Sequence, residues 1–148
     1  MVQDILPGRG SLGGLYTALQ ASQTDINSFV AVVACDMPFV NPKLLEAEVK
    51  KLLNGPFDAV IPLSEHGSES FHAIYHRSSC LPAIEKSLQA DKWRVNSWFP
   101  EVHIYHMPSE ETIIYDPNQL AFMNINTPAE LALAEKLAER IDLLSERL

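Results

Sequence analysis

Phe29-Val-Ala-Val-Val-Ala-Cys-Asp-Met-Pro38 joins an apolar run to a polar turn and gives the clearest indication of the fold. Residues 29–35 are all apolar, and a short continuous run of this kind is typical of a strand buried on both faces of a parallel sheet. Asp36 follows directly, and ligands of open α/β sheets bind beyond the carboxyl ends of the strands. We therefore expect a binding site at Asp36, with Cys35 buried in the strand.

The segments around this run alternate between helix-like and strand-like patterns. The sequence predicts helices at 12–21, 42–53, 81–90 and 128–147, further strands at 58–63, 71–76, 102–107 and 122–124, and loops at 64–70 and 109–111. Because this alternation implies right-handed crossover connections, we expect a mostly parallel sheet with helices on both faces. A length of 148 residues fits a single domain over 1–148.

The composition excludes several classes of protein. A formal net charge of −8 and a pI near 5.0 argue against binding to nucleic acid or to an anionic membrane. Two cysteines do not form a disulfide framework, and the first residues do not have the pattern of a signal peptide. The most apolar run is far shorter than the ~20 residues of a membrane helix. We expect a cytoplasmic protein.

A glycine-rich segment, Gly8-Arg-Gly10-Ser-Leu-Gly13-Gly14, precedes the first predicted helix. Glycines allow the backbone to approach a ligand closely, and the start of a helix offers free N–H groups to an anion. The same glycines match G-x-G-x-x-G, which leaves a dinucleotide-binding domain as an alternative. Against this alternative, Asp4 and Pro7 favour a loop rather than a strand before the glycines. An ordinary glycine-rich turn is a further alternative.

Two polar features lie at the predicted strand ends. Asp36 is a candidate Mg²⁺ ligand, since Mg²⁺ takes one or two protein carboxylates together with substrate phosphates; an Asp in a turn is the alternative. Asn124 and Asn126 are two apart on an extended segment and would point to one face, towards a polar ligand, unless they merely form a turn. Thr127 and Glu130 form a capping box for the last helix and need no further role.

Other candidates are weaker. His72 begins a predicted strand beside the polar loop 64–70 and is a candidate for substrate contact. Arg94 follows Trp93, whose ring could stack on a planar ligand, although such aromatic residues more often belong to the core or to an interface.

Three motifs together resemble the molybdenum cofactor guanylyltransferase family, which belongs to the nucleotidyltransferase superfamily. They are Gly10-Ser-Leu-Gly-Gly-Leu15, Ala34-Cys-Asp-Met-Pro38 and Asn124-Ile-Asn-Thr-Pro-Ala-Glu-Leu131. The resemblance implies a three-layer α/β/α Rossmann-like fold. It also implies transfer of GMP from GTP to molybdopterin cofactor, with Mg²⁺ as the cofactor and pyrophosphate as the second product.

The resemblance also assigns roles to residues at matching positions. The nucleotide-binding residues would be Asp4, Gly10, Leu12, Gly13 and Gly14. The catalytic residues would be Asp36 as the metal ligand, with Asn124 and Asn126 at the reaction centre. On the pterin side we expect His72 and Arg94.

One departure from the family concerns the N-terminal region. The family opens with a strand and a Gly-rich loop whose Ser, Arg and Lys hold the triphosphate, and we expect this segment to be missing here. Its loss would leave a sheet edge exposed, for self-association or for a partner chain. It also leaves open a catalytically inert nucleotide- or pterin-binding module or partner subunit. Transfer of CMP in place of GMP to the same cofactor is a further alternative.

Overall fold

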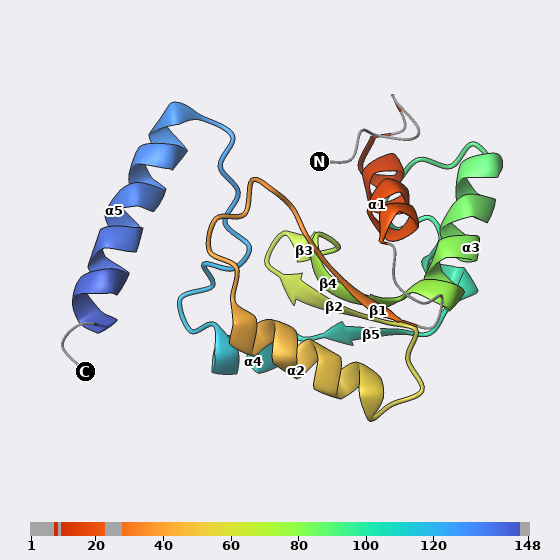
Figure 1. Ribbon diagram of the computed structural model, residues 1–148, viewed down its shortest axis with the longest axis horizontal. Helices are drawn as coiled ribbons and strands as arrows, with labels where there is room; N and C mark the ends of the chain where they lie inside the picture. The colour runs from red at the N-terminus through yellow and green to blue at the C-terminus, as the bar shows by residue number, and fades with distance from the viewer. Residues whose placement is uncertain (1–7, 9, 23–27, 146–148) are drawn as a thin grey trace.

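The order of helices and strands in the computed structural model follows the predicted alternation closely (Figure 1). The structure describes residues 8, 10–22 and 28–145, with side chains described up to residue 141. The elements are α1 (Gly10–Ala21), β1 (Phe29–Val33), α2 (Pro42–Leu53), β2 (Ala59–Ser64), β3 (Gly67–Ser68), β4 (His72–His76), α3 (Arg77–Gln89), the 3-10 helix η1 (Phe99–Glu101), β5 (Ile104–Met107), α4 (Ser109–Tyr115) and α5 (Pro128–Ser145).

The sheet places β4 between β1 and β2, and β5 pairs with the other side of β2. β2 and β5 are parallel, whereas β4 is antiparallel to both of its neighbours. Strands β1, β2 and β5 therefore run in one direction and β4 in the other. The expected crossover connection was wrong between β2 and β4, because residues 65–71 are too few for a parallel connection, which needs about a dozen or more residues.

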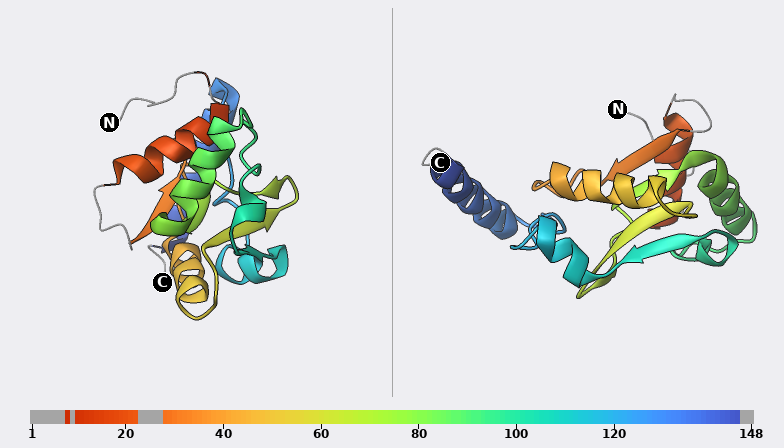
Figure 2. Two further views of the ribbon diagram at one scale, coloured as in Figure 1. Left: turned by 90° about the vertical axis from the view of Figure 1, so that its right-hand side faces the viewer. Right: turned by 90° about the horizontal axis from the view of Figure 1, so that it is seen from below.

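Alternation of side chains along the strands divides the core into two apolar layers. Ala59 and Ile61 of β2 pack with α1 and α3, whereas Val60 between them packs with α2. Strand β4 shows the same alternation, with Tyr75 in the first layer and Ile74 in the second. Figures 1 and 2 show the resulting order of helices, sheet and helices, which is the predicted three-layer α/β/α arrangement.

Helix α5 extends away from the sheet (Figure 2). Its start is the predicted capping box, because the Thr127 hydroxyl accepts from the Glu130 N–H at 3.2 Å and the Glu130 carboxylate accepts from the Thr127 N–H at 2.8 Å. Within α5, Ala134 is buried and Ile141 is exposed. No helix in the described part of the chain is long and apolar enough to cross a membrane.

Three local predictions were wrong. Residues 122–124 form no strand in the structure, and residues 109–111, predicted as a loop, form the first turn of helix α4. Glu110 and Glu111 in the first turn of α4 favour a helix start, because acidic side chains interact well with the free N–H groups there. Cys35 is exposed, since β1 ends at Val33 and the chain turns immediately afterwards.

Candidate active site

A cavity of about 310 Å³ lies at the carboxyl end of β1. It brings together two residues predicted as functional, Asp36 after β1 and Asn124 before α5, which are far apart in the sequence. The residues that line it are Ser11, Ala34, Asp36, Met37, Ser68, Glu69, Ser70, Phe71, Val95 and Asn124. The cavity therefore lies where strand-end reasoning expects a site.

A backbone hydrogen bond fixes Asp36 and Asn124 beside each other. The N–H of Ile125 donates to the carbonyl of Asp36 at 2.8 Å, which ties the segment before α5 to the turn after β1. Met37 is 6% exposed, and its side chain anchors the turn in the interior. The side chains of Asp36 and Asn124 remain partly or fully exposed at the cavity.

Helix α1 begins at the same cavity. Ser11, in its first turn, is a lining residue, and Gly10 before it has a φ of +59°, which disfavours any residue with a side chain. Apart from the chain neighbours and the backbone of α1 itself, no atom of the described residues lies within 4 Å of the position that a Cβ on Gly10 or Gly14 would occupy. The first N–H groups of a helix have no partner within the helix, and such groups bind anions.

The other predicted nucleotide-binding residues have different environments. Leu12 is 0% exposed and packs in the core, so the residue presents no accessible surface to a nucleotide. Gly13 is also buried. Asp4 lies outside the described residues.

Asn126, Arg94 and His72 do not line the cavity. Asn126 is exposed, and its N–H donates to the Glu130 carboxylate at 2.7 Å. Arg94 is exposed next to the lining residue Val95. His72 is 0% exposed and points towards α2, so the expectation of a direct substrate contact was wrong for this side chain. The reason is the two-residue alternation of β4, which turns His72 to the same face as the buried Ile74.

The sequence analysis did not predict that residues 68–71 line the cavity at the end of β1. Glu69 accepts a hydrogen bond from the Ser64 hydroxyl at 2.5 Å, and the Tyr75 hydroxyl donates to the Ser70 carbonyl at 2.6 Å. These two bonds fold the loop between β2 and β4 back over the end of β1. The Ser- and Glu-rich composition of the loop was the available signal, since polar side chains after a buried strand indicate a binding surface.

The donor set of the cavity fits a hard cation. Its charged lining residues are the carboxylates of Asp36 and Glu69, and none of the described lining residues is Lys or Arg. One or two carboxylates together with substrate phosphates satisfy Mg²⁺. No group of three or more His, Cys, Asp and Glu side chains within the described ranges is arranged to hold a metal, so phosphate oxygens would have to complete such a site.

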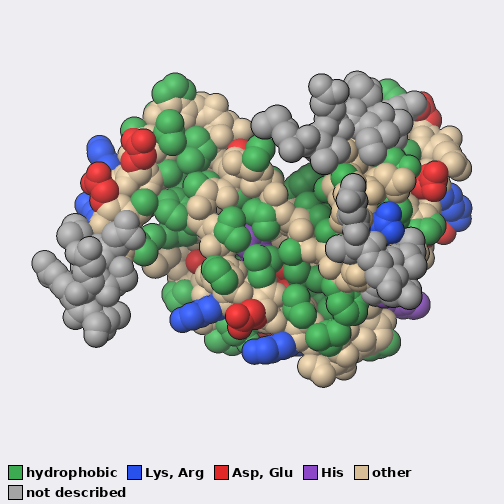
Figure 3. Space-filling model, in the orientation of Figure 1, with side chains coloured by type: hydrophobic (Ala, Val, Ile, Leu, Met, Phe, Trp, Pro, Cys, Tyr) green, Lys and Arg blue, Asp and Glu red, His purple; other side chains and the backbone are tan. Residues whose placement is uncertain are grey.

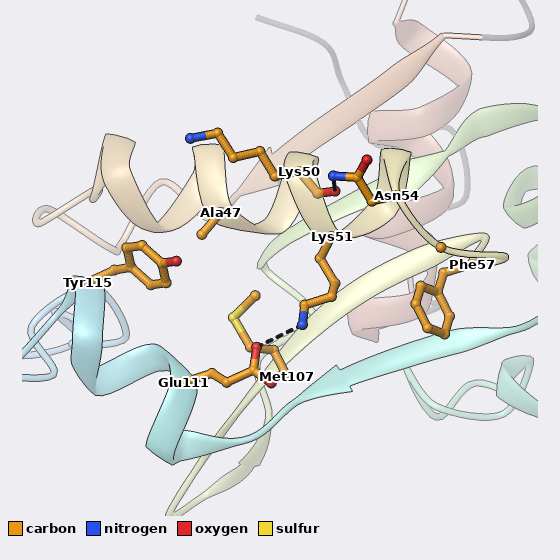
Figure 4. A pocket seen from close by; sticks show the side chains of 9 residues that line it. Ala47, Lys50, Lys51, Asn54, Phe57, Met107, Glu111 and Tyr115 are labelled. Atoms are coloured by element: carbon orange, nitrogen blue, oxygen red, sulfur yellow. Dashed lines mark hydrogen bonds and ion pairs between the residues drawn. The ribbon is translucent and has the colours of Figure 1, made fainter.

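A second pocket, of about 400 Å³, lies between α2 and α4 and shares no lining residue with the first (Figure 4). Lys51 reaches across it to Glu111 at 3.2 Å and lies 4.4 Å from the centre of the Tyr105 ring. The hydrogen bond from Tyr105, supported by Lys51, holds the pKa of Glu111 below its usual value. The Lys51 charge is thus neutralised within the fold. On the face of the molecule drawn in Figure 3, Lys and Arg side chains are dispersed and form no single cluster.

A helix-covered sheet with a glycine-rich helix start and a carboxylate shortly after strand β1 defines an α/β domain suited to nucleotides. The expected burial of β1 on both faces was wrong, because β1 lies at an edge of the described sheet and only Val32 of the strand is buried. The family described as the MobA-like NTP transferase domain matches residues 1–101 of this sequence. The chain belongs to this family.

Known proteins resemble the chain beyond the matched region. The "Probable molybdenum cofactor guanylyltransferase" of Pelotomaculum thermopropionicum is 32% identical over 94% of this chain and 65% of the relative. The crystal structure of molybdopterin-guanine dinucleotide biosynthesis protein A from Archaeoglobus fulgidus has a TM-score of 0.74 and 28% identity, over 88% of this chain and 64% of that one. A protein from Aquifex aeolicus, at 21% identity and a TM-score of 0.60, shares the fold. The similarity to the Aquifex aeolicus protein covers 85% of this chain and 61% of the other, so the chain spans less than two thirds of the length of each of these three proteins.

Proposed function

We propose that the cavity at the carboxyl end of β1 binds GTP with Mg²⁺, and that the protein transfers GMP to a molybdopterin-type cofactor. The observation that carries the proposal is the meeting of Asp36, Asn124 and the start of α1 in one cavity. The names of the relatives support the same reaction. The free thiols of Cys35 and Cys80 support a cytoplasmic location.

In this reaction a terminal phosphate oxygen of the molybdopterin attacks the α-phosphorus of GTP. A new oxygen–phosphorus bond forms, the bond from that phosphorus to the bridging oxygen breaks, and pyrophosphate leaves with the electron pair. Bound Mg²⁺ would neutralise phosphate charge. Asp36 would hold the ion, Asn124 would orient the reacting groups, and the N–H groups of α1 would bind an anionic oxygen. No nucleophilic side chain is needed.

One observation favours a second candidate, a nucleotide- or pterin-binding module that performs no transfer. None of the lining residues in the described part of the chain is a lysine or an arginine, although a triphosphate in the transition state is stabilised by such side chains. The two candidates differ in turnover. The selectivity for GTP over CTP is left open by the proposal, because the roles given to Asp36, Asn124 and the start of α1 involve the phosphates and not the base.

Formation of the guanylylated cofactor from GTP and molybdopterin, measured by chromatography, tests the proposal. We expect Mg²⁺-dependent product with the wild-type chain and a loss of about 100-fold or more with Asp36→Asn, because one ligand oxygen and a charge are removed. Glu139→Gln, which removes an exposed charge on α5, is the matched control and should retain activity. Product formation at the wild-type rate by Asp36→Asn would contradict the proposal. Binding of GTP without formation of product would favour the second candidate. Inhibition of the reaction by added CTP measures the selectivity of the site for guanine over cytosine.

A further inference from the structure

Glu48 of α2 and His72 of β4 form an ionisable pair inside the apolar layer between α2 and the sheet. Both side chains are 0% exposed, and His72 Nδ1 lies 3.2 Å from Glu48 Oε1. Around them this layer consists of apolar side chains such as Leu44 and Ile74. A carboxyl group and an imidazole in such surroundings lose most of their hydration.

The pair is incompletely satisfied. Glu48 Oε2 and His72 Nε2 are buried and have no hydrogen-bond partner among the described residues. Unpaired buried polar atoms reduce stability, and replacing a buried pair by apolar side chains of similar size is often neutral or stabilising. A contribution to stability therefore does not explain the presence of Glu48 and His72 in this layer.

The contacts of His72 lead directly to the candidate active site. Its ring meets the ring of Phe122 edge to face, with the centroids 5.6 Å apart and the planes at 89°. Phe122 is 8% exposed and lies two residues before Asn124. On either side of Phe122, hydrogen bonds hold the segment at its ends, from the Ala121 N–H to the Asp116 carboxylate and from the Ile125 N–H to the Asp36 carbonyl, both at 2.8 Å.

We propose that Glu48 and His72 are a positioning pair, which fixes the His72 ring against Phe122 and thereby holds segment 121–125, with Asn124, beside Asp36. The proposal rests on the proposed function for its consequence, because the positioned side chain is the one that meets the substrate. The hydrogen bond to Glu48 sets the orientation of the imidazole, and the edge-to-face contact transmits that orientation to the backbone. Neither residue of the pair touches the ligand.

The protonation state of Glu48 affects how firmly the pair holds segment 121–125. Burial raises the pKa of Glu48 to about 7, against the opposing hydrogen bond and charge of His72. The other ionisable groups on the elements packed against α2 are few or engaged elsewhere. β2 contributes none, Tyr75 of β4 faces the other layer, and His76 of β4 hydrogen-bonds to the hydroxyls of Ser78 and Ser79. Glu111 of α4 binds Lys51, and Asp116 accepts from the Ala121 N–H. Loss of the Glu48 proton places a carboxylate in the apolar layer whose desolvation His72 offsets only in part, and this favours opening of segment 121–125.

Hydrogen exchange at the Ile125 amide, followed by NMR without any ligand between pH 5.5 and 8.5, tests the positioning directly. The Ile84 amide in α3, within the other core layer, reports global unfolding. In the wild-type chain we expect the protection of Ile125, relative to Ile84, to fall about tenfold as the pH rises past 7. Glu48→Gln, which keeps the hydrogen bond but cannot ionise, should retain the protection and lose its pH dependence.

Glu48→Leu removes the hydrogen bond while keeping an apolar side chain of similar size, so the fold should persist. We expect about a tenfold loss of protection at Ile125 at every pH, and Leu52→Met in the same layer should show no such loss. Equal changes at Ile125 and Ile84 in all variants would overturn the proposal, because the pair would then act on global stability alone.

Affinity for Mg·GTP, measured by calorimetry on the same variants, separates this proposal from the proposed function. A loss of protection accompanied by about tenfold weaker binding in Glu48→Leu supports both. Lower protection with wild-type affinity overturns the role of the pair in positioning the site. If the wild-type chain does not bind Mg·GTP, the proposed function fails, while the exchange data still decide whether the pair holds the segment.

Discussion

Glu48 is a carboxyl group enclosed by apolar side chains, and this environment couples the stability of the protein to pH. Its pKa is raised by burial from 4.5 to about 7, so the folded protein retains a proton on Glu48 that the unfolded chain has lost. The resulting stabilisation is fully present below pH 4.5 and is lost as the pH rises through 7. Carboxyl groups with lowered pKa values, such as Glu111, contribute with the opposite sign.

Glu48→Gln isolates this contribution, because glutamine keeps the shape and does not ionise. Relative to Glu48→Gln, the wild-type free energy of unfolding should fall by up to about 3 kcal/mol between pH 4.5 and 7, as a shift of this size implies. Urea denaturation of both proteins across this range measures the difference. Contributions from Glu111 and other carboxylates cancel in the comparison. A difference that is constant with pH would show that Glu48 ionises at the same pH in both states.

At the scale of single elements, helix α2 has a start that side-chain hydrogen bonds define. Its start is fixed by Asn41, whose side-chain oxygen accepts from the N–H groups of Lys43 and Leu44 at 3.0 and 3.1 Å. The amide nitrogen of Asn41 donates to the Tyr115 carbonyl at 3.0 Å and so ties α2 to the end of α4. Pro42 at the first helical position completes the start.

Loss of this cap has a measurable cost. Asn41→Ala should lower the free energy of unfolding by about 1–2 kcal/mol, since two helix N–H groups and one carbonyl lose their partner. Asn118→Ala, at an exposed position in the loop after α4, is the matched control and should change stability by less than about 0.5 kcal/mol. Thermal or urea denaturation measures both. Equal effects of the two substitutions would contradict the role of the cap.

The elements also show which parts of the fold are predictable from sequence. The apolar run after Phe29 and the Asn41-Pro42 start of α2 carry strong local signals, and β1 and α2 form where these signals predict. The direction of β4 depends instead on the length of its connection, and the segment around Phe122 is held by side chains from distant parts of the chain. Local patterns carry no information about such contacts.

At the scale of the whole molecule, the site also combines features that the sequence predicts with features that depend on long-range packing. The strand-end rule for α/β sheets predicted a site at Asp36, because the rule concerns topology and needs no side-chain detail. The rule does not account for Asn124, since residues 122–124 form no strand; the family resemblance placed Asn124 at the reaction centre. The burial of His72 and Leu12 depends on how the two helical layers pack against the sheet, which short motifs do not specify. β1 lies at an edge of the described sheet, and self-association through that edge stays a prediction.

The dependence of GTP binding on Mg²⁺ tests most directly whether the cavity at the end of β1 is a nucleotide site organised by Asp36. Calorimetric titrations of the wild-type chain with GTP, in Mg²⁺ and in excess chelator, should show affinity at least about tenfold higher with the metal, since the ion joins a carboxylate to the phosphates. In Asp36→Asn this gain should disappear. An equal gain in both proteins, or no gain in the wild type, would contradict the account.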